Sequence, residues 1–178
     1  MAPTRIIIIR HAEKPGVPPC ENEAGVLPNG GNDKESLTVR GWERAGALAR
    51  FFSAQQALRP DAILASGIGP QSKSRRPKQT VTPLAKLLQI SIDDSHLMDD
   101  VETLMTDVIG RDGTVLLCWE HHRIPDLVAE LDNPPAIPPE WPDDRFDVVW
   151  VLDRSGSGWA FAQIPQLLLA GDSADPIT

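Results

Sequence analysis

Three short apolar segments dominate the hydrophobic pattern along this chain. They cover residues 6–9, 61–65 and 113–119, and the first consists of four consecutive isoleucines. A continuous apolar run without alternating polar positions is typical of a strand that is covered on both faces in a parallel or mixed sheet. The pattern therefore predicts a buried central sheet.

Segments with helical spacing follow these strands. A helix should open at residues 36–38 and run to about residue 54, with Thr38 as its N-cap and with Trp42, Ala45, Leu48, Ala49 and Phe52 on one face. Further helices are expected at residues 76–88, 99–109 and 125–131, and a brief strand at 90–92.

Turn-forming residues mark the rest of the chain. Residues 146–152 and 159–163 flank a turn-rich segment and predict a terminal β-hairpin. Residues 15–36 should form a long loop, and residues 133–143, which contain five prolines, a rigid irregular connector. We expect the last nine residues to be frayed.

The order of these elements predicts the fold class. We expect a single α/β domain over residues 1–178, built as a three-layer α/β/α sandwich. Its central sheet should be mostly parallel, with helices on both faces and the β-hairpin at the C-terminal end. The sequence contains no internal repeat.

Composition narrows the class of function. A hydrophobic fraction of 41% and a charged fraction of 24% are those of a globular chain rather than a disordered or fibrous one. A net charge of −8 argues against nucleic acid as the main partner. Because we find neither a membrane-length apolar segment nor a secretory signal, we expect a cytoplasmic protein without membrane contact. Cys20 and Cys118 are expected to be free thiols.

Three polar groups follow the predicted strands, at the sheet edge where open α/β sheets bind ligands. The first is Arg10-His11, directly after residues 6–9. A neutral imidazole can attack phosphorus, and a guanidinium can bind phosphoryl oxygens in a bidentate manner. A surface or capping role is the alternative for this dipeptide.

The other two polar groups also have a functional and a purely structural interpretation. Arg75 and Arg76 open a helix, where paired arginines indicate a bound anion, although a solvated basic patch would look the same. Glu120-His121-His122 follows the third strand, and either histidine could be purely structural. No spacing typical of a metal site is present, so we expect no metal and no cofactor.

Four motifs in order carry a family resemblance. They are Arg10-His11-Ala12-Glu13, the L-T-x-x-G pattern at residues 37–41, Ser66 followed by R-x-x-Q-T at residues 76–80, and a strand that ends at His121. Together they span about residues 5–131 and resemble the histidine phosphatase superfamily, which has the phosphoglycerate-mutase-like fold.

The resemblance implies a phosphate pocket of two histidines and two arginines. His11 would be the nucleophile that forms a phosphohistidine, Arg10 and Arg76 would clamp the phosphoryl oxygens, and His121 would donate to the transferring group. Such catalysis depends on positioning and charge, without a metal ion.

Several assignments stay open. Either His121 or Glu120 could stand at the position of the second family histidine, and we choose His121 because it supplies a donor. Arg76 is preferred over Arg75 because it keeps the R-x-x-Q-T spacing. Candidates for substrate binding are Lys14, for which a salt bridge to Glu13 is the alternative, Ser66 and His122. Glu13 and Glu120 are the foremost candidates for the leaving-group acid, and Asp99, Asp100 and Glu102 are also open.

The sequence thus predicts a metal-independent phosphomonoester hydrolase that acts through His11. Its substrate would be a phosphorylated small molecule or a phosphoprotein. The alternatives are a non-catalytic module of the same fold that binds a phosphorylated ligand, and a phosphomutase. The sequence leaves the oligomeric state open.

Overall fold

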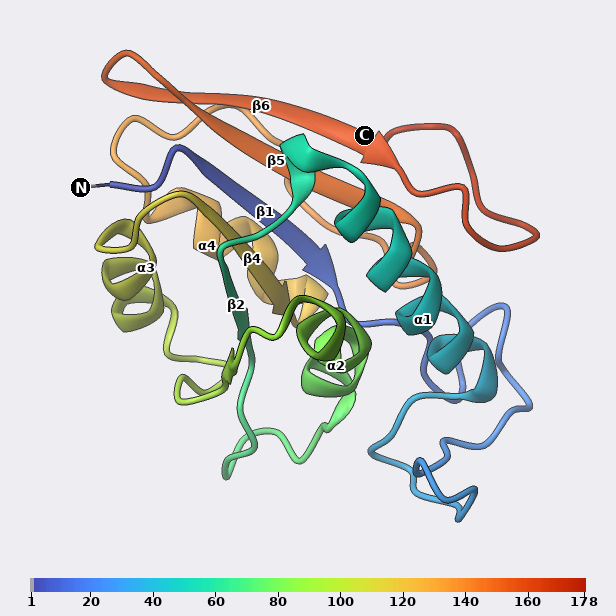
Figure 1. The fold of residues 1–178 in the computed structure, drawn as a ribbon. Coiled ribbons are helices and arrows are strands. Elements are labelled where there is room, and N and C mark those ends of the chain that lie inside the picture. The colour runs from blue at the N-terminus through green and yellow to red at the C-terminus, as the bar shows by residue number, and fades with distance from the viewer. Residues whose placement is uncertain (1) are drawn as a thin grey trace.

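A single six-stranded sheet, with the order β3-β2-β4-β1-β5-β6, forms the centre of the molecule (Figure 1). The computed structural model describes residues 2–178. The strands are β1 (Arg5–Arg10), β2 (Ala62–Ala65), β3 (Ile92–Asp93), β4 (Thr114–Trp119), β5 (Val148–Ser155) and β6 (Gly158–Pro165). Strands β3, β2, β4 and β1 pair in parallel, whereas β5 is antiparallel to both β1 and β6. The predicted mostly parallel sheet with a C-terminal hairpin is confirmed.

Helices cover both faces of this sheet, as predicted. They are α1 (Val39–Ala54), α2 (Arg76–Leu88), α3 (Val101–Ile109) and α4 (Ile124–Ala129), with short 3-10 turns η1 (Gln56–Leu58) and η2 (His121–Arg123). Side chains of α1 and α2 pack on one face of the sheet, and side chains of α3 and α4 pack on the other. The molecule is therefore a three-layer sandwich (Figure 1).

The isoleucine run explains why β1 is a central strand. Ile6 and Ile8 point to the side of α3 and α4, whereas Ile7 and Ile9 point to the side of α1 and α2. None of the four is more than 1% exposed. Since successive side chains of a strand face opposite ways, only a strand covered on both faces can bury such a run.

The expected helix boundaries agree with the structure to within about two residues. Thr38 caps α1, because its Oγ1 accepts a hydrogen bond of 3.1 Å from the Gly41 N–H. Helix α2 begins at Arg76 and tolerates Pro77 in its first turn, where no intrahelical N–H is needed. No helix within residues 2–178 combines the length and the apolar character that crossing a bilayer requires.

The C-terminal segment is ordered against the fold, so the prediction that it frays is wrong. Ile177 is 3% exposed and exchanges hydrogen bonds with the side chain of Gln163 on β6. Asp172 forms a buried ion pair with Arg44 of α1, at 2.7 Å. These partners lie far from the segment in sequence, so local composition could not reveal them.

Candidate active site

The ends of the neighbouring strands β1 and β4 bring the predicted catalytic residues together. Arg10 lies opposite Trp119 in the parallel register, so His11 and Glu120 leave adjacent strands at the same edge. The His11 N–H donates to the Trp119 carbonyl at 3.2 Å and extends the pairing by one step. His121 begins the turn η2 immediately afterwards.

His11 is held in one tautomer. Its Nδ1 lies 2.7 Å from the carbonyl oxygen of Ala12, and because a carbonyl only accepts, Nδ1 carries the proton. Burial lowers the pKa of this fully buried imidazole, and the charge of Arg10 adds to the effect. The ring is therefore neutral, and Nε2, which forms no hydrogen bond, presents a free lone pair.

Arg10 is anchored through one end of its guanidinium group. Nη1 donates to the carbonyls of Pro142, Asp143 and Arg145 at 2.6 to 3.2 Å. The guanidinium carbon lies 3.8 Å from the centre of the Phe146 ring. Nε and Nη2 are buried without a partner, and a free guanidinium edge of this kind can bind an oxyanion in a bidentate manner. Burial lowers the pKa of Arg10 to about 10, which leaves it charged at neutral pH.

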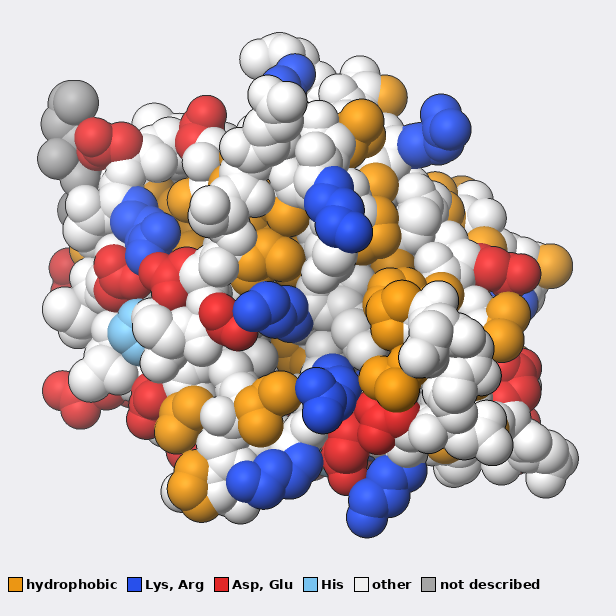
Figure 2. All heavy atoms as spheres, turned by 60° about the horizontal axis from the view of Figure 1, so that its bottom comes forward, with side chains coloured by type: hydrophobic (Ala, Val, Ile, Leu, Met, Phe, Trp, Pro, Cys, Tyr) orange, Lys and Arg blue, Asp and Glu red, His pale blue; other side chains and the backbone are white. Residues whose placement is uncertain are grey.

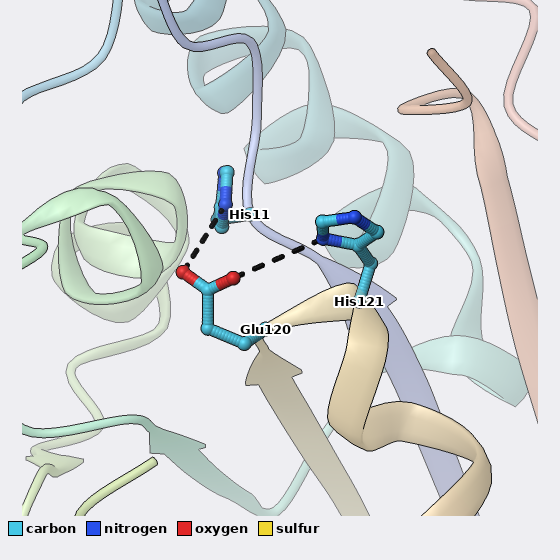
Figure 3. A group of neighbouring side chains, drawn as sticks. All are labelled: His11, Glu120 and His121. Atoms are coloured by element: carbon cyan, nitrogen blue, oxygen red, sulfur yellow. Dashed lines mark ion pairs between the residues drawn. The ribbon is translucent and has the colours of Figure 1, made fainter. Parts of the chain in front are cut away.

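The Glu120 carboxylate lies between the two histidines (Figure 3). Its Oε1 is 3.5 Å from His11 Nε2, and its Oε2 is 3.8 Å from His121 Nδ1. Burial opposes ionisation of Glu120, but His11, His121 and Lys14 lower the pKa of its carboxyl group. Since His11 is neutral, the positive charge that favours the ionised Glu120 is that of Lys14.

His121 is oriented by a carboxylate that the sequence analysis did not single out. Its Nε2 lies 2.5 Å from Oδ1 of Asp143, which is near the end of the proline-rich connector. The hydrogen bond from His121 lowers the pKa of Asp143, so the carboxylate is ionised and Nε2 carries the proton. Burial and the charge of Arg10 lower the pKa of His121 to about 4. Its Nδ1 is buried and forms no hydrogen bond.

Glu13 lies outside this cluster, in a buried ion pair. Its Oε1 is 2.8 Å from Arg44 Nη2 and 3.4 Å from Arg40 Nε, and its side chain is 1% exposed. With both oxygens bonded to Arg44, Glu13 is part of the structural support rather than of the cluster around His11.

Comparison with known proteins identifies the fold. Neither a protein-family model nor a curated protein matches the chain by sequence. YhfR from Bacillus stearothermophilus has a TM-score of 0.55 over 95% of this chain and 97% of its own, at 15% identity. A Nakamurella multipartitia protein named as the phosphohistidine phosphatase SixA has a TM-score of 0.53 at 17% identity, over 89% of this chain and 92% of its own. An Escherichia coli protein named as an alpha-ribazole-5'-P phosphatase has a TM-score of 0.50 at 13% identity, over 89% and 95%.

The protein has the histidine phosphatase fold.

In this histidine phosphatase fold, Arg76 and Lys14 border the cluster. Arg76 Nε donates to the Ser36 carbonyl at 3.2 Å, and Arg76 Nη2 donates to the Lys34 carbonyl. Burial lowers the pKa of both Arg76 and Lys14, while attraction to Glu120 opposes that shift in each. Lys14 forms no ion pair with Glu13 within the described part of the chain, which leaves its ammonium available to the cluster.

The other motif residues fix the segment around His11 through hydrogen bonds and close packing. The Thr80 hydroxyl accepts a 2.9 Å hydrogen bond from the N–H of Ala12, the residue after His11. Gln79 Oε1 accepts from the Leu37 N–H at 2.9 Å. A Cβ on Gly41 would lie 2.5 Å from the Glu13 carbonyl oxygen, so only glycine allows this approach. The spacing of the motifs thus reflects packing around the segment that carries His11.

Ser66 and His122 lie at the borders of the site rather than in its centre. Ser66 lines a cavity of about 400 Å³ together with Trp42, Arg75 and Lys78. His122 is 72% exposed and contacts His121, with ring centres 3.8 Å apart and ring planes tilted by 38°. Figure 2 brings the bottom of Figure 1 forward and shows a face on which Lys and Arg side chains lie close to Asp and Glu side chains.

Proposed function

We propose that the protein is a phosphomonoester hydrolase that works through a phosphohistidine on His11. The observation that carries the proposal is the free lone pair on Nε2 of a buried, neutral His11 whose other nitrogen is bonded to a carbonyl. Two of the structures with the same fold carry phosphatase names, which agrees with a phosphorylated substrate.

The first step would transfer the phosphoryl group to the protein. Nε2 of His11 attacks phosphorus, so that an N–P bond forms while the P–O ester bond breaks. The leaving oxygen keeps the electron pair and takes a proton from a general acid, for which Glu120 is the nearest carboxyl. Arg10 supports this step, because its two unpartnered nitrogens can bind two phosphoryl oxygens.

The second step would release phosphate. Water attacks the phosphorus of the phosphohistidine, the N–P bond breaks, and the proton of the water returns to the group that donated in the first step. A bound phosphate dianion raises the pKa of His121, so that Nδ1 takes up a proton from solvent and, with the ring held by Asp143, stabilises the charge on the phosphoryl oxygens. This scheme needs no metal ion, so EDTA should not abolish the activity.

The decisive experiment combines a variant with chemical trapping. His11→Ala should abolish hydrolysis of p-nitrophenyl phosphate while its thermal unfolding stays close to that of the wild type. Wild-type protein quenched in alkaline denaturant should carry an acid-labile, base-stable phosphate that maps to His11. Retention of most of the activity in the variant, or a label on another residue, would refute the proposal.

A further inference from the structure

His11 and His121 each direct an unpartnered ring nitrogen toward the same carboxylate (Figure 3). His11 Nε2 lies 3.5 Å from one oxygen of Glu120, and His121 Nδ1 lies 3.8 Å from the other. Both histidine side chains are fully buried. Buried polar atoms without partners are rare in folded proteins and call for an explanation.

The opposite nitrogen of each ring is already bonded to an acceptor. His11 Nδ1 donates to the Ala12 carbonyl, and His121 Nε2 donates to the Asp143 carboxylate. Histidines that bind metal ions are fixed in this way, with one nitrogen donating to a carbonyl or carboxylate and the other free to coordinate. The tautomers and the ring orientations for coordination are therefore set in advance.

The spacing of the three groups fits a small tetrahedral ion. Zinc binds imidazole nitrogen and carboxylate oxygen at about 2.0–2.2 Å, so neighbouring ligand atoms in a tetrahedron are about 3.3 Å apart. With one atom taken from each residue, the ligand atoms of His11, Glu120 and His121 all lie within 4.8 Å of one another. His11 Nε2 is 3.5 Å from Oε1 of Glu120, and His121 Nδ1 is 3.8 Å from its other oxygen, Oε2. Small side-chain shifts would bring the three ligand atoms to the spacing of a tetrahedral zinc site.

We propose that this cluster is a binding site for a divalent transition-metal ion, with Zn²⁺ as the best match. His11 Nε2, a Glu120 oxygen and His121 Nδ1 would be the ligands, and a fourth position would remain for water. Two imidazoles and one carboxylate suit zinc, whereas magnesium and calcium prefer oxygen ligands alone. The charges of Arg10 and Lys14 oppose a cation, so binding is weaker than in closed structural zinc sites.

Occupation of this site would inhibit the proposed hydrolase, a consequence that rests on the proposed function. The ion takes the lone pair of His11 Nε2, which is the pair that has to attack phosphorus. Zinc and a phosphomonoester therefore compete for the same atoms. The zinc-free protein is the active form, and zinc binding inhibits its hydrolase activity reversibly.

The binding test uses the full chain, stripped with a chelator and then dialysed free of it. Calorimetric titration with ZnCl₂ should show one ion per chain with a dissociation constant below about 100 µM. His11→Ala, Glu120→Gln and His121→Ala should each weaken binding at least about tenfold. His122→Ala and His96→Ala are the matched controls and should bind zinc as the wild type does.

Two readouts keep the result independent of folding and activity. Co²⁺ bound in place of zinc should give the intense visible absorption of a tetrahedral site, and Glu120→Gln should change that spectrum. Thermal unfolding of each variant without metal shows whether it is folded. Because Glu120 is 15% exposed, Glu120→Gln is the variant least expected to disturb the core.

The outcomes separate the two proposals. Absence of saturable binding by the wild type would overturn the metal site even if His11 proves to be phosphorylated. Binding that survives Glu120→Gln but is lost in His122→Ala would also overturn it, since the ion would then lie at the exposed group of His121, His122 and Asp143. Binding without any phosphorylation of His11 would refute only the proposed function. With p-nitrophenyl phosphate, zinc should raise the apparent KM, and activation by zinc would contradict the inhibitory role.

Discussion

At the scale of single residues, the neighbouring histidines His121 and His122 are in opposite environments. His121 is fully buried and bonded to Asp143, whereas His122 is largely exposed. The two residues follow one another in the turn η2, where successive side chains leave the backbone in different directions, and only one of them is buried. The buried one, His121, faces the His11 cluster.

We therefore expect the two alanine variants to differ in kind. His121→Ala should lower kcat by about 10²-fold or more, the usual loss when one preorganised charge-stabilising group is removed. His122→Ala should leave kcat close to that of the wild type and alter KM at most, because a residue at the border contributes to binding. Steady-state kinetics with p-nitrophenyl phosphate would measure both. An inactive His122→Ala variant together with a nearly normal His121→Ala variant would show that His122, not His121, acts on the phosphoryl group.

The role of Glu120 as the proton donor can be tested with substrates whose leaving groups differ in acidity. A substrate dianion next to Glu120 raises the pKa of that carboxyl, which lets it hold the proton that the leaving oxygen needs. Glu120→Gln should reduce kcat for an alkyl phosphate by about 10²-fold or more, but only slightly for p-nitrophenyl phosphate, whose leaving group needs no acid. Glu130→Gln, on the exposed end of α4, is the control. An equal loss with both substrates would assign Glu120 a role other than acid.

At the scale of elements, the start of helix α1 is fixed against the segment that carries His11. The Thr38 N–H donates to the Glu13 carbonyl at 3.1 Å, and Gly41 packs against the backbone of Glu13. Thr80 of α2 holds the same segment, because its hydroxyl accepts a hydrogen bond from the Ala12 N–H. Two helices thus position the segment that carries His11.

Two glycines in α1 provide a matched comparison. In Gly41→Ala the new Cβ would lie 2.5 Å from the Glu13 carbonyl oxygen, so we expect a loss of about 1–3 kcal/mol in the free energy of unfolding. In Gly46→Ala the new Cβ meets nothing within 4 Å, and the variant should gain about 0.5–1 kcal/mol through helix propensity. Urea denaturation measures both. Equal effects at the two positions would refute the packing argument.

At the scale of the whole molecule, Arg44 ties three distant parts of the chain together. It binds Glu13 of the loop after β1, Gln166 after β6, and Asp172 of the C-terminal segment, all at 2.7 to 3.1 Å. Removal of one partner from such a buried network leaves charges without compensation. The network is therefore the structural reason why the C-terminal segment is ordered.

Breaking this network should destabilise the fold. Arg44→Met leaves the buried Glu13 and Asp172 unpaired, and we expect it to lower the free energy of unfolding by about 3–5 kcal/mol. Arg50→Met, on the exposed side of the same helix, should change it by no more than about 0.5 kcal/mol. Denaturation in urea would measure the difference, and a mild effect of Arg44→Met would mean that the C-terminal segment is held by its apolar contacts.

The network also makes stability depend on pH. Burial would raise the pKa of Asp172, but hydrogen bonds from Arg44 and from the backbone of Leu168 and Leu169 lower it. A group with a lower pKa in the folded state stabilises the fold above its unfolded pKa of about 3.9, and that contribution is lost as the pH falls further. Between pH 6 and pH 2, Asp172→Asn should flatten the decline in unfolding free energy that the wild type shows. An unchanged decline would assign the acid sensitivity to other carboxyls.

The sequence by itself determined the elements and their order. The isoleucine run, the Thr38 cap and Pro77 in a first helical turn are local signals, and they predicted strands and helices close to the observed ones. The motifs predicted that His11 and His121 meet, because parallel strands end at one edge. Periodicity and caps depend on neighbours in sequence, which is why they can be read without a structure.

Only the tertiary structure decided which partners these residues have. Asp143 reaches His121 from a connector 22 residues further along, and Asp172 reaches Arg44 over 128 residues. The tautomer of His11, the unpartnered edge of Arg10 and the burial that keeps His11 neutral also depend on chain segments packed around them. Hydrogen bonds and desolvation depend on contacts in space. Contacts between irregular segments leave no periodic pattern in the sequence, so they cannot be predicted from it.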